Sequence, residues 1–408
     1  MELLIVGSGG AAGACLGGLL RCQPQGRRIT VATASSLPIY ERPILSKGYL
    51  TSDTPRLPVL LDRAALDDHG VVVHERAEVD SIDLAGRTCG LTSGVELRWD
   101  QIVIATGSDA RVLPVEGHDL AGVLTLRGRR DADRLRDHLR RSTRVVIIGA
   151  GLIGLEVAAA AVSLGAEVDV VEAGPRALGR VAPPEIAHAV AALHRQRGVR
   201  IHESTSLSAI LGDQVVKAVM TSSGVRLEAD TVVIAVGSRP RDTIARRAGL
   251  PTDDGVLVTP ALRSVAADDV FAIGDVARVV GHPFIHGPWR SESWRVAQQQ
   301  GSVLAANLDG EQQTFDAIPW FWSDQYDMVL QGAGVPSAAT RWITRVHSAA
   351  TTICFGLNDG QLTAVSALGP LRDIGRPVSL ASRAIARRLK LDIAGATDPT
   401  VALDGLLR

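Results

Sequence analysis

The sequence has few of the features that mark secreted, membrane or nucleic-acid-binding proteins. Its four cysteines form no CxxC pair and no Cys/His cluster with zinc spacing, so we expect reduced thiols and no metal site. No apolar run is long enough to span a bilayer, and the first residues lack the basic segment of a signal peptide. The formal net charge of −1 provides no field that attracts nucleic acid or an anionic membrane. These absences predict a cytoplasmic protein with neither partner.

Aromatic residues make up only 3% of the 408 residues, whereas 46% are hydrophobic, as in α/β proteins rich in Ala, Val and Leu. This length predicts two or three domains. Arginines cluster locally despite the small net charge. They are either solvated helix faces or a docking patch for an acidic protein, and both alternatives stay open. The clusters are Arg127-Arg129-Arg130, Arg140-Arg141-Arg144 and Arg195-Arg197-Arg200.

The strongest pattern is a nucleotide-binding fingerprint in the middle of the chain. Four β-branched residues, 145–148, predict a buried strand, and residues 155–164 predict a helix. Between them lies GxGxxG, whose glycines permit a tight turn, the approach of a pyrophosphate and close helix packing. A second strand, 167–171, ends in Glu172, whose carboxylate suits the ribose diol of NADH and repels the 2′-phosphate of NADPH. The alternative is a turn of the same shape without a ligand. The predicted NADH contacts are Gly149, Gly151, Leu152, Ile153, Gly154 and Glu172.

A second fingerprint opens the chain. Residues 3–6 predict a strand, GxGxxA follows, and a helix is expected through Leu20. The next strand, 28–32, is not followed by an acid but by Thr33-Ala34-Ser35-Ser36, whose hydroxyls are weaker ribose acceptors. Loss of a charged acceptor costs on the order of 1.5–3 kcal/mol, so we expect a working site with reduced affinity. Its predicted contacts are Gly7, Gly9, Gly10, Ala11, Ala12, Thr33 and Ala34.

Two fingerprints in one chain imply two dinucleotides that exchange electrons. At Tyr40–Lys47, with Arg42, Pro43 and Lys47, the sequence resembles the FAD-dependent ferredoxin reductases that supply Rieske-type dioxygenases and bacterial cytochromes P450. Further motifs follow in the order found in that family, and the resemblance covers essentially the whole chain. It implies FAD and NADH as cofactors and a [2Fe–2S] ferredoxin as partner.

The resemblance also implies roles for particular residues. It assigns Asp275 to the FAD ribityl chain, Trp294 to the isoalloxazine ring, and Glu156 and Glu292 to the nicotinamide as positioning or proton-balancing groups. Trp320 is either at the flavin edge from which electrons leave or in a hydrophobic core. The other expected cofactor contacts are Arg42, Lys47, Val79, Ala105, Thr106, Gly107, Arg127, Val236, Gly237, Gly274 and Ser293.

The remaining segments complete the predicted architecture. Residues 71–73 and 98–104 suggest a small sheet that returns to the main one, 102–107 and 232–240 are strand-to-turn crossovers, and 270–277 delivers Asp275 to a helix start. Helices are expected over 131–140, from 294 through 300, and over 377–389, the last after four short strands. We therefore predict two Rossmann-like domains plus a C-terminal α+β domain. The segments are 1–109 and 236–313 for FAD, 110–235 for NADH, and 314–408 for the C-terminal domain.

The predicted reaction is hydride transfer from NADH to FAD, then single-electron transfer to an acidic ferredoxin steered by surface arginines. Charge reversal at Arg290 or Arg295 is expected to slow ferredoxin reduction but not reduction of a small dye. A disulfide reductase or NADH oxidase needs a redox cysteine beside the flavin, and no cysteine pair here has that spacing. The other alternative is a redox-gated binding flavoprotein similar to apoptosis-inducing factor. A monomer and a homodimer are both compatible with the sequence.

Overall fold

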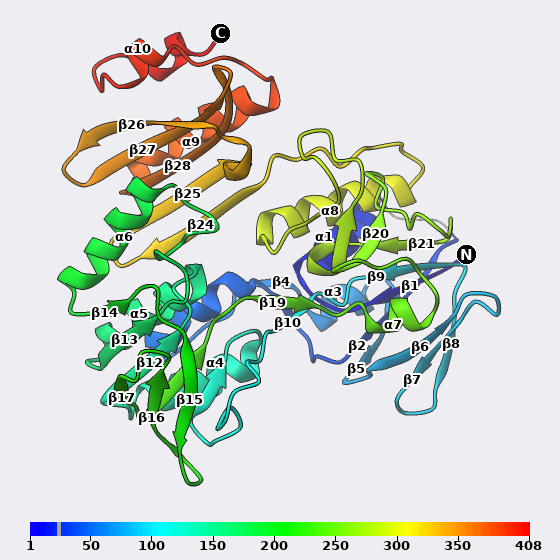
Figure 1. Ribbon diagram of the computed structural model, residues 1–408. Helices are drawn as coiled ribbons and strands as arrows, with labels where there is room; N and C mark the ends of the chain where they lie inside the picture. The colour runs from blue at the N-terminus through cyan, green and yellow to red at the C-terminus, as the bar shows by residue number, and fades with distance from the viewer. Residues whose placement is uncertain (23–25) are drawn as a thin grey trace. The chain divides into compact units, whose positions relative to one another are not determined.

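The computed structural model describes residues 1–22 and 26–408. They form two compact units, each assembled from separate stretches of the chain (Figure 1). Unit 1 contains Met1–Arg42, Leu57–Asp109 and Ser238–Pro319; unit 2 contains Pro43–Arg56, Ala110–Gly237 and Trp320–Arg408. The finer division into four segments, with boundaries at residues 109, 235 and 313, stays a prediction.

Unit 1 is built on a five-stranded parallel sheet with the strand order β21-β9-β1-β2-β5. Its strands are short and almost wholly apolar because both faces of a parallel sheet are covered. The helices α1 (Gly10–Cys22) and α8 (Trp294–Leu308) pack against each other. The strands are β1 (Glu2–Val6), β2 (Arg28–Thr33), β5 (Val72–Glu75), β9 (Gln101–Ile104) and β21 (Val270–Ala272).

The prediction that residues 71–73 and 98–104 form a small sheet that returns to the main one is partly correct. Arg98 ends a strand of the small sheet and residues 101–104 form β9 of the main sheet, but residues 72–73 lie in β5 of the main sheet, where their apolar side chains help to fill its faces. The small antiparallel sheet is made by the intervening residues, which alternate buried and exposed positions. It consists of β6 (Val79–Asp83), β7 (Thr88–Leu91) and β8 (Glu96–Arg98).

Shorter elements complete unit 1. They are β3 (Ile39–Tyr40) paired with β4 (Val59–Leu61), the 3₁₀ turn η2 (Gly274–Val276), α3 (Arg63–Asp67) and α7 (Thr243–Arg247), and the sheet of β20 (Val256–Val258), β22 (Ala277–Val279) and β23 (Trp289–Arg290). Asp275 lies in the 3₁₀ turn rather than at the start of an α-helix, which corrects the expectation for residues 270–277. Helix α8 runs to Leu308, a further two turns beyond the predicted end at residue 300.

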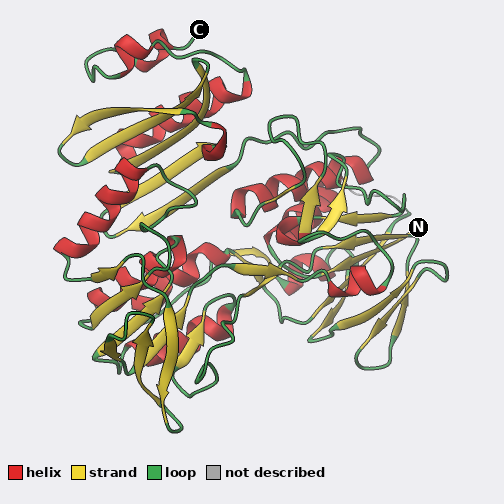
Figure 2. Ribbon diagram, viewed as in Figure 1, coloured by secondary structure: helices red, strands yellow, loops and turns green. Residues whose placement is uncertain are grey.

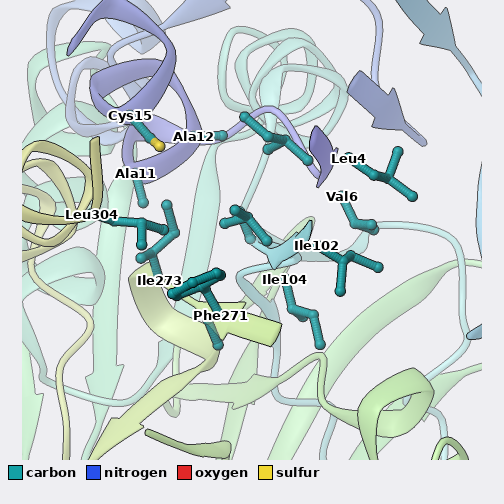
Figure 3. Close-up of a cluster of buried hydrophobic side chains, with 14 of the residues drawn as sticks. Leu4, Val6, Ala11, Ala12, Cys15, Ile102, Ile104, Phe271, Ile273 and Leu304 are labelled. Carbon is teal, nitrogen blue, oxygen red and sulfur yellow. The ribbon is translucent and has the colours of Figure 1, made fainter. Parts of the chain in front are cut away.

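The core of unit 1 joins the two helices to the main sheet (Figure 3). Ala12 and Cys15 of α1 and Leu304 of α8 face Ile104 and Phe271 from the strands, and all five are buried. Small side chains on α1 allow this close packing, which holds the start of the helix against the strand ends.

Unit 2 repeats the parallel design with the order β11-β18-β12-β13-β14. The strands are β11 (Val123–Thr125), β12 (Arg144–Ile148), β13 (Glu167–Val171), β14 (Arg200–His202) and β18 (Thr231–Ile234). The helices are α2 (Gly48–Thr51), α4 (Arg129–Leu139), α5 (Leu152–Ser163) and α6 (Pro184–Gln196). An antiparallel sheet of β15 (Leu207–Gly212), β16 (Val216–Thr221) and β17 (Arg226–Glu228) packs against the inner strands β12 and β18. Strand β10 (Ser108–Ala110) pairs with β19 (Ser238–Pro240).

The C-terminal part of unit 2 is an antiparallel sheet with the order β24-β25-β28-β27-β26. Helices α6 and α9 both pack against it (Figure 2). The strands are β24 (Trp320–Gln325), β25 (Met328–Gly334), β26 (Arg341–Ser348), β27 (Thr351–Asn358) and β28 (Gln361–Gly369), followed by α9 (Leu371–Ala386) and α10 (Ile393–Ala396).

Helix α9 begins at Leu371, so the prediction of a start at Pro377 was wrong. Proline often occupies the first position of a helix, but here the apolar stripe of Ile374, Val378 and Ala381 outweighs one missing backbone hydrogen bond. The predicted fold class, with two Rossmann-like domains and a C-terminal α+β domain, is confirmed. Within the described residues, no helix has the length and apolar character to cross a membrane.

Candidate functional site

The first fingerprint forms a sharp turn between β1 and α1. Gly7 has φ +116°, and a Cβ there would clash with the Ala105 carbonyl, so only glycine fits. The Gly7 amide donates to Ala32 at 2.8 Å, and α1 begins at Gly10. The free N–H groups of this 13-residue helix and its positive dipole end are suited to a phosphate.

The second fingerprint has the same construction in unit 2. Gly149 has φ +104°, and a Cβ there would lie 2.6 Å from the Ala235 carbonyl oxygen. The Gly149 amide donates to Val171 at 2.8 Å, and a Cβ on Gly154 would overlap the Gly149 carbonyl. Each turn is therefore a cradle that any side chain would fill. The structure brings the predicted residues Gly149 to Gly154 together at the start of α5.

Glu172 lies beside the second turn, as its position after β13 predicted. One carboxylate oxygen accepts the Ala150 amide and the other accepts the Gly174 amide, both at 2.7 Å. A carboxylate accepts more than two hydrogen bonds, so Glu172 keeps capacity for a diol while it braces the turn.

The corresponding position in unit 1 holds Thr33, which is buried. Its hydroxyl bonds Ser8 Oγ at 2.7 Å and accepts the Ser35 amide at 3.1 Å. Whichever of the two hydroxyls donates, one hydroxyl hydrogen of the pair is left for a ligand. Ala34 is exposed, and Glu75, in register with Thr33 on β5, supplies a carboxylate that the sequence analysis missed. Glu75 accepts the Leu37 amide at 2.8 Å.

Two buried polar residues that the sequence analysis did not identify hold the turn that carries Asp275. Ser108, which follows the predicted turn residue Gly107, donates to the Asp275 carboxylate at 2.9 Å. Gln300 of α8 accepts the Gly274 amide at 2.7 Å. A Cβ on Gly274 would lie 3.0 Å from that of Ala11, so this turn borders the first fingerprint. Thr106 completes the region by donating to the Arg241 carbonyl at 2.8 Å.

Trp294 packs over the start of α1. A Cβ on Gly10 would clash with the Trp294 ring, so the indole can take this position only because residue 10 of the fingerprint is glycine. The Arg42 guanidinium lies 3.8 Å from the position of a Cβ on Gly9. Unit 1 thus gathers the fingerprint, Arg42, Asp275 and Trp294 in one place. Ser293 precedes α8 as its N-cap residue.

Glu292 is exposed and pairs with Arg290 at 3.0 Å. Arg290 also pairs with Asp254 at 3.0 Å, and its side chain is only 10% exposed. Arg290 is therefore an ion-pair partner of two carboxylates, and its role in steering a ferredoxin stays a prediction. Arg295 is exposed and lines a pocket of about 430 Å³ with Gln298, Ser302 and Asp316.

In unit 2, Lys47 and Glu156 form a buried ion pair at 2.6 Å. Glu156 lies on α5, just after the fingerprint, and is 6% exposed. Its carboxylate also accepts the hydroxyls of Ser46 and Ser323. Lys47 contacts Asp324 at 3.2 Å and lies 5.7 Å from the centre of the Trp322 ring. Neither serine was predicted; their proximity to Glu156 depends on long-range packing.

Trp320 is half-buried at the start of β24, with its ring centre 5.5 Å from that of Trp322. Arg127 precedes α4, where its amide donates to Asp131 at 3.0 Å. Val79 is buried in β6, and Val236 and Gly237 form the turn after β18. Val236 borders the second fingerprint, since a Cβ on Gly149 would lie 3.4 Å from its amide nitrogen.

Most of the clustered arginines have acidic partners. Arg129, Arg140, Arg144, Arg195, Arg197 and Arg200 pair with Asp133, Asp53, Asp230, Glu203, Asp327 and Asp169. This pairing favours solvated surface networks over a strongly positive docking patch at these positions.

The cysteines are free, and three of them are buried. Burial raises the pKa of Cys15 and Cys89 to about 12 and that of Cys354 to about 11. A thiol in such surroundings is a poor nucleophile because the reactive thiolate is absent at neutral pH. Among the described residues, no group of His, Cys, Asp and Glu could hold a metal ion.

Two family models match consecutive parts of the chain. Residues 1–301 match the family model described as pyridine nucleotide-disulphide oxidoreductase, and residues 320–407 match the model described as reductase C-terminal. The chain is 34% identical to the ferredoxin–NAD(+) reductase component of the anthranilate 1,2-dioxygenase system of Burkholderia cepacia, covering 99% of this chain and 98% of that protein. It is 36% identical to rhodocoxin reductase of Rhodococcus erythropolis, over 85% of this chain and 81% of that protein.

Among solved structures, the chain resembles the ferredoxin reductase of the CYP199A2 system from Rhodopseudomonas palustris. The TM-score is 0.93 with 32% identity, and the match covers 99% of both chains. Two cradles of the same design, each at a strand-to-helix turn, agree with a family that binds two dinucleotides. The chain therefore belongs to the pyridine nucleotide-disulphide oxidoreductase family and is an FAD-dependent oxidoreductase that uses NADH.

Proposed function

We propose that this oxidoreductase is a ferredoxin–NAD(+) reductase that supplies a Rieske-type dioxygenase or a cytochrome P450. Electrons pass from NADH to FAD and then singly to a [2Fe–2S] ferredoxin. The observation that carries the proposal is the pair of glycine cradles at Gly7 and Gly149 in one chain. Similarity along almost the full chain to a ferredoxin–NAD(+) reductase component and to a reductase of a P450 system supports the choice of acceptor.

Unit 1 residues hold FAD. The α1 N-terminus and Arg42 bind the pyrophosphate, Asp275 binds the ribityl chain, and the Thr33–Ser8 hydroxyl pair faces the adenosine ribose. Support comes from their convergence on one turn and from the close fit of Trp294 over Gly10. FAD supplies the hydride-accepting and one-electron chemistry when bound, which no side chain here provides.

Unit 2 residues hold NADH. The α5 N-terminus binds its pyrophosphate, and Glu172 accepts the ribose hydroxyls and disfavours a 2′-phosphate. Lys47 and Glu156 orient the reacting rings: Glu156 fixes the Lys47 ammonium, and Lys47 keeps a hydrogen for the cofactor. Their burial and short ion pair support this role, because a fixed charge needs no reorganisation during the reaction.

We assign the binding of the electron acceptor, the ferredoxin, to two tryptophans and to the exposed Arg295. Trp320 and Trp322 supply an aromatic surface on β24, and Arg295 supplies positive charge toward an acidic ferredoxin. We place the enzyme in the cytoplasm, which agrees with free cysteines, three of them buried. We expect a monomer or a homodimer.

Reduction of disulfides or peroxides is disfavoured. Such enzymes require a reactive thiolate, whereas burial holds the Cys15 and Cys89 pKa values near 12. A redox-gated binding flavoprotein is distinguished by a long-lived complex of reduced flavin with NAD⁺ and by slow turnover with every ferredoxin.

The proposal is tested by the visible spectrum of the purified protein under anaerobic titration. We expect a flavin spectrum that bleaches rapidly with NADH and poorly with NADPH, and reoxidation by a [2Fe–2S] ferredoxin. A colourless protein that takes up no FAD would refute the first site. A flavin that NADPH reduces as well as NADH does would refute the role of Glu172.

A further inference from the structure

A chain of buried side-chain hydrogen bonds runs through unit 2 and ends at Glu156. Ser323 and Gln325 occupy alternate positions of β24, so both face the same side of the sheet, and both are fully buried. Ser323 Oγ bonds the Glu156 carboxylate, and Gln325 Nε2 bonds Ser323 Oγ at 2.8 Å. His194, fully buried on α6, then bonds Gln325 Oε1 through Nε2 at 2.8 Å.

The outer end of the chain reaches the protein surface at the hairpin between β24 and β25. The Tyr326 hydroxyl bonds His194 Nδ1 at 3.1 Å. The Arg197 guanidinium carbon lies 4.7 Å from the centre of the Tyr326 ring, and Arg197 pairs with Asp327 at 2.8 Å. Tyr326 is thus fixed from both sides.

The protonation states of His194 and Tyr326 fix which group donates in each hydrogen bond of the series. Burial lowers the pKa of His194 to about 4, so its imidazole is neutral and carries one hydrogen. Burial raises the pKa of Tyr326 to about 12, so its phenol stays protonated and donates to Nδ1. His194 therefore donates from Nε2 to Gln325, the Gln325 amide donates to Ser323, and Ser323 donates to Glu156.

The chain is suited to orient groups rather than to move protons. Proton hopping requires each member to accept and release a proton, and the Gln325 amide does not exchange its hydrogens in that way. Reversal of any link would leave a buried donor or acceptor unpaired, which is unfavourable. The direction of the Ser323 hydroxyl is therefore fixed from Tyr326, three links away.

The fixed Ser323 hydroxyl matters because it bonds the same carboxylate oxygen of Glu156 as the Lys47 ammonium. Glu156 Oε1 accepts both Ser323 and the Lys47 ammonium, while Oε2 accepts Ser46. Lys47 also forms an ion pair with Asp324 at 3.2 Å. The ammonium is thereby held between two carboxylates, and the direction of its remaining hydrogens follows from where the Glu156 carboxylate is held.

We propose that His194, Gln325 and Tyr326 are positioning residues that act through Ser323 to fix Glu156, and through Glu156 to aim the Lys47 ammonium at its cofactor. The assignment of Lys47 to the cofactor rests on the proposed function. The orientation of Lys47 itself does not, so the two can be tested separately.

Lysine labelling tests the orientation without any cofactor chemistry. The chain has only three lysines, Lys47, Lys217 and Lys390, so reductive methylation followed by peptide mass spectrometry resolves each one. Lys47 is 12% exposed, whereas Lys217 is 62% exposed and serves as the internal standard. We expect Gln325→Met and Tyr326→Phe to raise the Lys47 labelling rate at least several-fold relative to Lys217, because Glu156 and Lys47 gain freedom.

The matched control is Val190→Ala. It shortens a buried side chain one turn before His194 on α6 and alters none of the hydrogen-bonded residues from Tyr326 to Glu156. It should destabilise the protein but leave the Lys47 labelling rate unchanged. Equal labelling in the wild type, Gln325→Met and Tyr326→Phe would overturn the inference. A rise in Val190→Ala as large as in the other two variants would also overturn it, since general loosening would then explain the effect.

Kinetics with the FAD-loaded enzyme complete the test. Gln325→Met should lower the rate constant of flavin reduction at saturating NADH about ten-fold and change the KM for NADH less than two-fold. A merely structural role of Gln325 would not lower the rate constant selectively in this way. Raised Lys47 labelling with an unchanged reduction rate would overturn the catalytic part of the inference. If the wild type is not reduced by NADH, the proposed function fails, and the labelling experiment still decides whether the chain orients Lys47.

Discussion

Acid should destabilise this protein through one buried imidazole, that of His194. Burial lowers its pKa from the ordinary value of 6.5 to about 4, because the charged form cannot be solvated inside the α6–β24 packing. Between these two pH values, the His194 imidazole therefore binds a proton in the unfolded chain but not in the folded chain. The free energy of unfolding must fall as the pH drops from about 6.5 toward 4, and His194 has no effect above that range.

The magnitude follows from the shift. A change from 6.5 to about 4 corresponds to about 3 kcal/mol over the full range, of which about 2 kcal/mol is lost by pH 5. The perturbation is His194→Gln, which keeps an amide donor but does not titrate. Urea unfolding at pH 7 and pH 5 should show that the wild type loses about 2 kcal/mol more than the variant.

His188→Gln is the matched control, because His188 lies on the same helix but is exposed. It should show the same pH dependence as the wild type. Equal acid losses in the wild type and in His194→Gln would refute the reasoning, since His194 would then titrate alike in the folded and unfolded chains.

Other substitutions test the nucleotide sites. Glu172→Ala should raise the KM for NADH on the order of ten- to hundred-fold, because a charged acceptor is lost, and lower the KM for NADPH, because the carboxylate that repels its 2′-phosphate is removed; an equal rise for both would contradict this. Gly154→Ala should abolish NADH binding but retain bound FAD, because its methyl group overlaps the Gly149 carbonyl; loss of both cofactors would point to misfolding. Ala34→Glu should lower the Kd for FAD about ten-fold in titrations of apoprotein, and an unchanged Kd would show that this position is remote from the ribose. Arg295→Glu should slow reduction of an acidic ferredoxin but not of ferricyanide, and equal slowing would exclude a docking role.

Local sequence was sufficient to predict the two nucleotide turns. Gly7 and Gly149 are required by backbone shape and by a carbonyl that leaves no space for a side chain, and such requirements are visible in a short motif. Glu172 was predictable for the same reason, since a strand end places it beside the turn. The missing acid after β2 was also visible, although its neighbour Glu75 was not, because strand register joins residues 33 and 75 only in the folded sheet.

Side chains that meet across distant segments could not be predicted. Ser46, Glu156 and Ser323 come from three separated stretches of unit 2, and nothing in their local sequence indicates that they meet. The low exposure of Arg290 could not be predicted either, because it depends on Asp254 and on the packing of β22 and β23, not on its own residue type. The start of α9 was misplaced because a local rule for proline was outweighed by an apolar stripe that packs on the sheet.

The central claim is that electrons pass from NADH through FAD to a one-electron acceptor. Its most direct test is anaerobic stopped-flow spectroscopy, in which the FAD-loaded enzyme is mixed with one equivalent of NADH and then with two equivalents of oxidised [2Fe–2S] ferredoxin. The account predicts rapid loss of the oxidised flavin absorbance, then its recovery as two ferredoxins are reduced for each NADH consumed. A flavin that NADH reduces but that ferredoxin never reoxidises would contradict the account.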